Sequence, residues 1–241
     1  MGRHLQKGFT IIEVMLVLAI TSLMLSAVLN NSSRRVNEQH YREGVESFRD
    51  FLAGTFEDID SVKNDVLGQI KRCNSSPFAG DNTVAWRGSA ECFYSGREVT
   101  ITYDRSSGST KLTSRSVKAF IDPSGTTEPQ YIAVMDTREA NLREQDIDWG
   151  VGAMQPKPHS NNGYSNYKMR IIRNPKSGAK IFQIQDSAGG AWRTPENNII
   201  FCMKNPFYND NQWQMVTVDK NAINSSGITT NNGRDSCGVN T

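Results

Sequence analysis

The sequence contains none of the short motifs that commonly mark an active site. It has no G-x-S-x-G, G-x-x-x-x-G-K-[ST], H-E-x-x-H or G-x-G-x-x-G pattern. Histidine occurs three times, at scattered positions, and neither C-x-x-C nor H-x-x-x-H spacing is present. A zinc site is therefore disfavoured. We expect no enzymatic activity and no cofactor.

A strong excess of charge of one sign is also absent. The chain has 27 basic and 25 acidic residues, which gives a formal net charge of +2. Dedicated nucleic-acid binders usually carry a marked basic excess. The near-balance therefore argues against that class of protein.

The chain has only one long apolar run. In the 21 residues from Phe9 to Leu29, 16 are apolar and Glu13 is the single charged residue. As a helix this run would be about 31 Å long, close to the thickness of a hydrocarbon core. The run predicts one membrane-spanning helix and disfavours both a freely soluble cytoplasmic protein and a multi-pass transporter.

The residues before the apolar run predict its orientation. Met1 to Gly8 contains Arg3 and Lys7 and no acidic residue. Positive charge beside an apolar helix favours the cytoplasmic side. The polar body of roughly 210 residues is then expected outside the cytoplasmic membrane.

All four cysteines lie in this body, and an even number in an exported domain suggests two disulfides. Three pairings are possible. We favour Cys73–Cys92 and Cys202–Cys237, because each closes a local, polar, turn-rich segment. Four buried free thiols are the alternative.

The boundary of the apolar run carries a specific pattern. The residues are Lys7-Gly8-Phe9-Thr10-Ile11-Ile12-Glu13-Val14. This pattern resembles the prepilin leader of type IV pilins and their relatives in secretion and competence systems. The resemblance implies that a membrane peptidase cleaves between Gly8 and Phe9, and that Phe9 is then N-methylated. Loss of Arg3 and Lys7 leaves 25 basic side chains against 25 acidic ones.

Glu13 is unusual because a carboxylate inside a membrane helix costs roughly 2.5 to 3.5 kcal/mol on insertion scales. The resemblance implies an assembly role, in which Glu13 pairs with the new Phe9 amine of a neighbouring subunit. That pair would also set the axial register between subunits. The alternative is that Glu13 extends toward the nearby membrane interface.

A second helical pattern follows the apolar run. Asn30-Asn31-Ser32-Ser33 favours caps and turns and predicts a local break. Apolar residues then recur with a mean spacing of about 3.6. They are Tyr41, Val45, Phe48, Leu52, Phe56, Ile59, Val62, Val66 and Ile70. This pattern predicts an amphipathic helix over 30–72 whose stripe is covered by the body, with a coiled-coil partner as the alternative.

Short β-branched and aromatic runs predict strands beyond Cys73. These runs are Val99–Tyr103, Tyr131–Met135, Tyr167–Arg173, Ile181–Gln185, Ile199–Met203 and Trp213–Val218. Asn174 to Gly178 predicts a hairpin turn. Without helical crossovers the sheet should be antiparallel. The fold class is therefore α+β and pilin-like, with a long N-terminal helix packed on an antiparallel sheet.

The predicted organisation has four parts: a leader (1–8), a transmembrane and assembly helix (9–29), an amphipathic helix (30–72) and a β body (73–241). Residues 150–166 and 219–241 are rich in Asn, Gly, Ser and Pro and are expected to be loops. The resemblance supports a C-terminal loop closed by Cys202–Cys237.

Several polar clusters remain to be weighed. The acidic groups at 57–60 and 144–148 could suggest paired carboxylates, but the first lies on the predicted amphipathic helix and is expected to face solvent. Residues 209–211 lack the pattern of an EF-hand calcium loop. Basic residues gather on the predicted hairpin, and we interpret them as a solvated face rather than a nucleic-acid site. They are Lys168, Arg170, Arg173, Lys176 and Lys180.

The resemblance predicts a structural subunit of a type IV pilus or related filament machine, and the size of the chain favours a minor pilin or a pseudopilin. A tip adhesin, a DNA-binding pilin of a competence system and a type II secretion pseudopilin are the alternatives. Implied partners are other pilins, the prepilin peptidase and methylase, a platform protein and an assembly ATPase. The subunit would move from the membrane into a surface filament.

Overall fold

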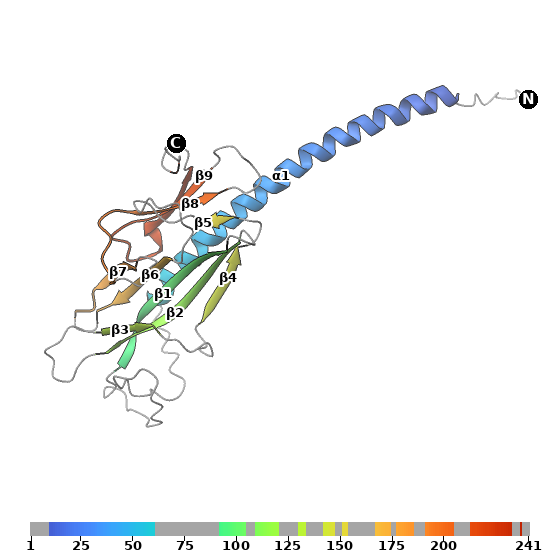
Figure 1. Cartoon of the computed structure of the whole chain (residues 1–241). Coiled ribbons are helices and arrows are strands. Elements are labelled where there is room, and N and C mark those ends of the chain that lie inside the picture. The colour runs from blue at the N-terminus through green and yellow to red at the C-terminus, as the bar shows by residue number, and fades with distance from the viewer. Residues whose placement is uncertain are drawn as a thin grey trace, which may run out of the picture. The chain divides into compact units, whose positions relative to one another are not determined.

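The computed structural model describes residues 10–60, 92–104, 109–120, 130–133, 142–147, 151–153, 167–174, 177–185, 191–204, 213–232 and residue 237. The chain divides into two compact units, Met1–Arg42 and Glu43–Thr241. Helix α1 (Ile11–Asp60) is 50 residues long, begins in the first unit and ends in the second (Figure 1). The predicted continuation of the helix over 61–72 lies outside the described residues.

The predicted break at Asn30–Ser33 is wrong, because α1 is helical throughout this segment. The Ser33 hydroxyl donates to the Leu29 carbonyl at 3.1 Å. Such a bond to the preceding turn lets a serine remain inside a helix, although serine on average favours caps and turns.

The predicted apolar stripe is buried wherever the structure describes it. Val45, Phe48, Leu52, Phe56 and Ile59 are each at most 2% exposed. Phe51 and Thr55 are buried as well. The Thr55 hydroxyl donates to the Phe51 carbonyl within the same helix. The buried face is therefore wider than the stripe predicted from the sequence.

The first sheet is antiparallel and has six strands. It has the order β3-β2-β1-β6-β7, and β4 also pairs with β2. The strands are β1 (Cys92–Asp104), β2 (Ser109–Phe120), β3 (Gln130–Ala133), β4 (Arg143–Ile147), β6 (Tyr167–Arg173) and β7 (Lys180–Gln185). Figure 1 shows β1, β2 and β4 side by side along the later part of α1.

The second sheet is smaller and also antiparallel. Its order is β10-β9-β8-β5. The strands are β5 (Gly152–Ala153), β8 (Ile199–Lys204), β9 (Trp213–Val218) and β10 (Ile228–Asn232), and a short 3-10 helix, η1 (Ser225–Gly227), precedes β10.

The α+β class is confirmed, and all six predicted strands overlap observed ones. The predicted hairpin is β6–β7, and its turn has Gly178 at a φ of 70°, a conformation that glycine adopts readily. Strands β2, β4, β5 and β10 were not predicted. Two of them, β5 and β10, correct the expectation that 150–166 and 219–241 are loops throughout.

Aromatic side chains join α1 to both sheets in the core. Phe48 of α1 meets Phe201 of β8 edge to face, with ring centroids 5.3 Å apart. Phe56 of α1 lies 6.0 Å from Phe182 of β7. Edge-to-face pairs add to the stabilisation from area burial. The part of α1 after Arg42 is thus an integral part of the body's hydrophobic core.

Candidate functional site

The start of α1 is defined by a side-chain cap. The Thr10 hydroxyl accepts a hydrogen bond from the Glu13 backbone N–H at 3.3 Å. Thr10 with Glu13 three residues later is the capping-box pattern, a local signal in the sequence for the start of this helix. Glu13 therefore lies in the first turn, where the helix dipole favours a negative charge. Gly8 and Phe9 lie outside the described residues.

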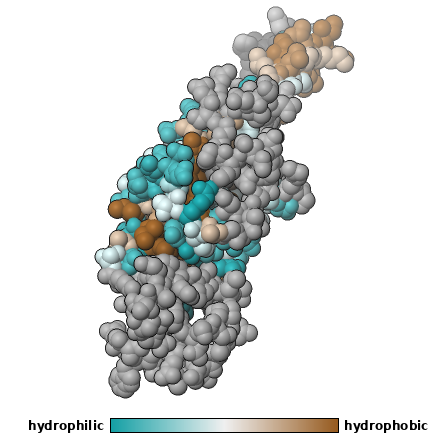
Figure 2. Space-filling model, turned by 60° about the vertical axis from the view of Figure 1, so that its left-hand side comes forward, coloured by the Kyte–Doolittle hydropathy of each residue, from teal (hydrophilic) through white to brown (hydrophobic). Residues whose placement is uncertain are grey.

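The first part of α1 exposes its apolar side chains. Every large apolar residue from Ile11 to Leu29 is at least 45% exposed, for example Ile11 at 79% and Leu23 at 73%. Figure 2 shows a hydrophobic surface on this stretch, whereas the described part of the body visible in this view is mostly hydrophilic with smaller hydrophobic patches. The helix is long and apolar enough to cross a membrane.

Two hydroxyls within this apolar stretch are bonded to the helix itself. Thr21 donates to the carbonyls of Val17 and Leu18, at 2.9 and 3.1 Å. Ser22 also donates to Leu18, at 2.7 Å. Polar groups without water must find partners inside the protein. These bonds therefore make Thr21 and Ser22 compatible with a hydrocarbon environment.

A disulfide ties the end of the body to the second sheet. Cys202 of β8 and Cys237 are bonded, with an S–S distance of 2.03 Å, and both are buried. This is one of the two pairings that the sequence favoured. Cys92 is the first residue of β1, and Cys73 lies outside the described residues.

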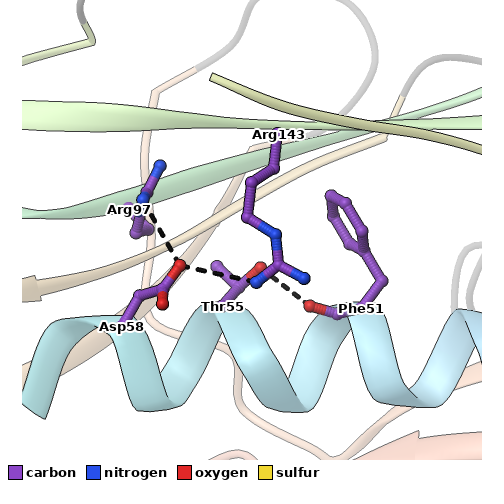
Figure 3. A network of polar contacts seen from close by, with 5 residues as sticks. All are labelled: Phe51, Thr55, Asp58, Arg97 and Arg143. Carbon is purple, nitrogen blue, oxygen red and sulfur yellow. Dashed lines mark hydrogen bonds and ion pairs between the residues drawn. The ribbon is translucent and has the colours of Figure 1, made fainter. Parts of the chain in front are cut away.

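Asp58 connects the end of α1 to two strands. Its Oδ2 atom lies 3.3 Å from Arg97 of β1 and 3.5 Å from Arg143 of β4 (Figure 3). The Arg143 guanidinium also lies over the Phe51 ring, 5.4 Å from its centroid. The expectation that the acidic group at 57–60 faces solvent is therefore wrong for Asp58, because two arginines hold it against the sheet.

Further contacts fix β4 along α1. The Gln145 amide donates to the Ser47 hydroxyl. The two glycines of α1, Gly44 and Gly54, lie where β4 and its neighbourhood approach most closely. A Cβ at Gly44 would lie 2.9 Å from Val151 Cγ2, and one at Gly54 would lie 3.0 Å from an Arg143 nitrogen. At Gly44 the missing side chain lets Val151 and Ile147 lie close to the helix, whereas the neighbour of Gly54 is the flexible end of the Arg143 side chain.

The basic residues of the hairpin do not form one patch. Lys168 and Arg170 lie two positions apart and share a face, whereas Arg173 is on the opposite face. Arg173 is opposite Lys180, whose amine donates to the Ile223 carbonyl at 3.1 Å. Arg170 stacks on Trp192 at 4.0 Å from the ring centroid. The interpretation of the cluster as a solvated face is therefore wrong for Arg170, which is buried, and Lys176 lies outside the described residues.

Glu98 lies between the basic residues on the face of the first sheet that is turned away from α1. It is opposite Arg115 of β2 and Arg170 of β6, and is 8% exposed. Burial raises the pKa of its carboxyl above 4.5, although nearby Lys168, Arg170 and Arg115 act in the opposite direction. The buried environment of Glu98 therefore destabilises the ionised form of its carboxyl relative to the protonated form.

Within the described ranges, no cluster of His, Cys, Asp or Glu could hold a metal ion. The arrangement in those ranges consists of an exposed apolar helix with a capped start, joined to a body built around the same helix. The interactions found in these ranges are hydrophobic packing of α1 on the sheets and ion pairs between charged side chains.

Comparison with known proteins supports this view of the N-terminus. Residues 3–29 match the family model of the prokaryotic N-terminal methylation motif, which is the leader signature of type IV prepilins. This motif supports a type IV pilin or pseudopilin precursor processed by prepilin peptidase, in a family whose role is structural. No curated protein and no solved structure matches the chain.

Proposed function

We propose that this chain is a minor pilin or pseudopilin that enters a filament through its N-terminal helix. The observation that carries the proposal is the continuity of the methylation motif with a helix whose apolar side chains are exposed from Ile11 to Leu29. In the precursor this surface contacts lipid. In the filament it packs against the same segment of neighbouring subunits, so the surface remains out of water in both states.

Processing at Gly8–Phe9 changes the charges at the start of the helix. Cleavage removes Arg3 and Lys7 and creates an amine at Phe9, which is then methylated. The Thr10 cap fixes Glu13 in the first turn of α1, four residues after Phe9 in the sequence. Pairing of Glu13 with the amine of a neighbouring subunit offsets both charges and fixes the axial register of the two helices.

The body is exported and carried on the outside of the filament. Its own core includes the buried face of α1 from Val45 to Ile59. The Cys202–Cys237 bond is suited to an oxidising compartment outside the cytoplasm. The leader charges favour the same topology.

Cleavage is tested with Gly8→Ala in a bacterium that has a prepilin peptidase. The expected result is an uncut precursor in the membrane, identified by mass spectrometry of the N-terminal peptide. Gly2→Ala, a change of the same type within the same leader, is the matched control and should be cleaved normally. Normal cleavage of the Gly8 variant would contradict the processing step.

Register is tested with Glu13→Ala, which should be cleaved and should remain in the membrane rather than appear in sheared filaments. Glu46→Ala is the control, because Glu46 is an exposed glutamate later in the same helix. Recovery of the Glu13 variant in sheared filaments at the wild-type level would refute the pairing while leaving the processing step intact.

A further inference from the structure

Two hydroxyl groups of β2 are buried without hydrogen-bond partners. Ser114 is 0% exposed and Ser116 is 1% exposed. Neither Oγ atom has a hydrogen-bond partner in the part of the chain that the structure describes. Buried polar groups in folded proteins are almost always hydrogen-bonded, and an unpaired one is costly. Two such groups on the same face of one strand therefore indicate an unassigned ligand.

The strand register places each hydroxyl beside an arginine. Ser116 is directly opposite Arg97 of β1, and Ser114 is directly opposite Arg143 of β4. The Cβ atoms of directly opposed residues lie about 4.5 to 5.5 Å apart. Both arginines reach Asp58 on α1, so this face of the sheet is turned toward the helix (Figure 3). Each serine therefore lies on the same face of the sheet as the arginine directly opposite it.

The two arginine contacts of Asp58 are longer than most charge-assisted hydrogen bonds. Both guanidinium groups approach the same oxygen, Oδ2, at 3.3 and 3.5 Å. Charge-assisted hydrogen bonds between such groups are usually about 2.7 to 2.9 Å long. The Arg97 side chain is only 7% exposed, so its charge is largely removed from water. A second negative charge would be stabilised here by Coulomb attraction in a poorly solvated place.

We propose that this cluster binds a small monovalent anion, chloride, between Ser114, Ser116, Arg97 and Arg143. The two hydroxyls and the guanidinium groups all donate hydrogen bonds, and a spherical anion accepts such bonds from any direction. A larger oxyanion suits the place less well, because the serines are almost fully buried. The ion joins β1, β2 and β4 beneath the end of α1. This site is independent of the proposed function.

The test measures thermal unfolding of the full chain in detergent micelles by tryptophan fluorescence. Sodium gluconate is replaced by sodium chloride at constant ionic strength. The midpoint should rise with the logarithm of the chloride concentration once chloride exceeds the dissociation constant, and by roughly 3 to 6 °C at a tenfold excess. Identical midpoints in the two salts would overturn the proposal.

Variants locate the ion. Ser114→Ala/Ser116→Ala should lose the chloride-dependent rise and should be at least as stable as the wild type in gluconate, because the unpaired hydroxyls are gone. Thr113→Ala changes the opposite face of the same strand and should keep the full rise. A rise that persists in the double variant would overturn the site.

Crystals of the full chain grown with bromide provide the direct view. An anomalous peak within hydrogen-bond distance of the Ser114 and Ser116 hydroxyls is expected. A water molecule only at this place would overturn the proposal.

Discussion

Replacing Cys202 and Cys237 together by alanine removes the covalent link between β8 and the segment after β10. The bond spans 35 residues, and this span contains β9 and β10. In the chain-entropy model, closing a loop of this length stabilises the fold by about 4 kcal/mol at 25 °C. The alanines add little packing cost, because the sulfur atoms are replaced by hydrogen at two small buried positions.

The loss is measured by urea unfolding of the full chain in micelles, followed by tryptophan fluorescence, with Trp213 on β9 as a local reporter. With a urea dependence of about 3 kcal/mol/M, the midpoint should fall by about 1.3 M. The single variant Cys202→Ala should lose as much stability as the double variant, because it also removes the disulfide. A loss below about 1 kcal/mol would refute the reasoning, because it would mean that the loop is equally restricted in the unfolded chain without the bond.

Three further predictions concern the body, each measured by urea unfolding of the full chain. Glu98→Gln should have a higher free energy of unfolding than the wild type at pH 7, and this gain should vanish as the pH falls toward 4.5, because the raised pKa penalises only the ionised carboxylate. A variant less stable than the wild type at pH 7 would contradict the raised pKa. Asp58→Asn should lower the free energy of unfolding by about 2 to 3 kcal/mol, whereas the control Asp50→Asn, at a 70% exposed carboxylate, should lower it by under about 0.5 kcal/mol. Equal losses in the two variants would count against the ion pairs of Asp58 with Arg97 and Arg143. Phe48→Ala should lower the free energy of unfolding by about 3 to 5 kcal/mol, because the side chain is 0% exposed and meets Phe201. A loss near 1 kcal/mol would show that this contact is not part of the core.

The helical part of the fold was predictable because its signal is local and periodic. The spacing of Val45, Phe48, Leu52, Phe56 and Ile59 identified the buried face directly. The predicted break at 30–33 failed for a related reason. Caps and turns are statistical preferences of serine and asparagine, and a continuous helix tolerates these residues when a hydroxyl bonds to the preceding turn.

The unpredicted strands have sequences that look like loops. Strand β2 is rich in serine, threonine and lysine, yet Ser114 and Ser116 are buried by contacts distant in the sequence. Strand β4 is an edge strand with charged residues, and such charges protect an edge while hiding its β pattern. Strand β10 is hidden in an asparagine-rich tail. Tertiary context decides all three strands, which composition does not reveal.

Two local signals could have indicated more of the site. Thr10 followed by Glu13 is a capping box at the start of an apolar run, and it predicts the first turn of α1. Gly44 and Gly54 interrupt an otherwise good helical pattern, and such glycines often mark a close approach of another element. The partner of Asp58 could not be predicted, because Arg97 and Arg143 lie on strands whose register is set by the whole sheet.

The central claim is that the chain is processed at its leader and then enters a surface filament. The most direct measurement is mass spectrometry of the N-terminal peptide, in protein taken separately from native membranes and from sheared surface filaments. The account predicts a chain that begins at N-methylated Phe9 in the sheared fraction, at low abundance relative to the main shaft subunit. An intact Met1 confined to the membrane fraction would contradict the account and would make the chain a membrane-anchored domain that keeps its leader.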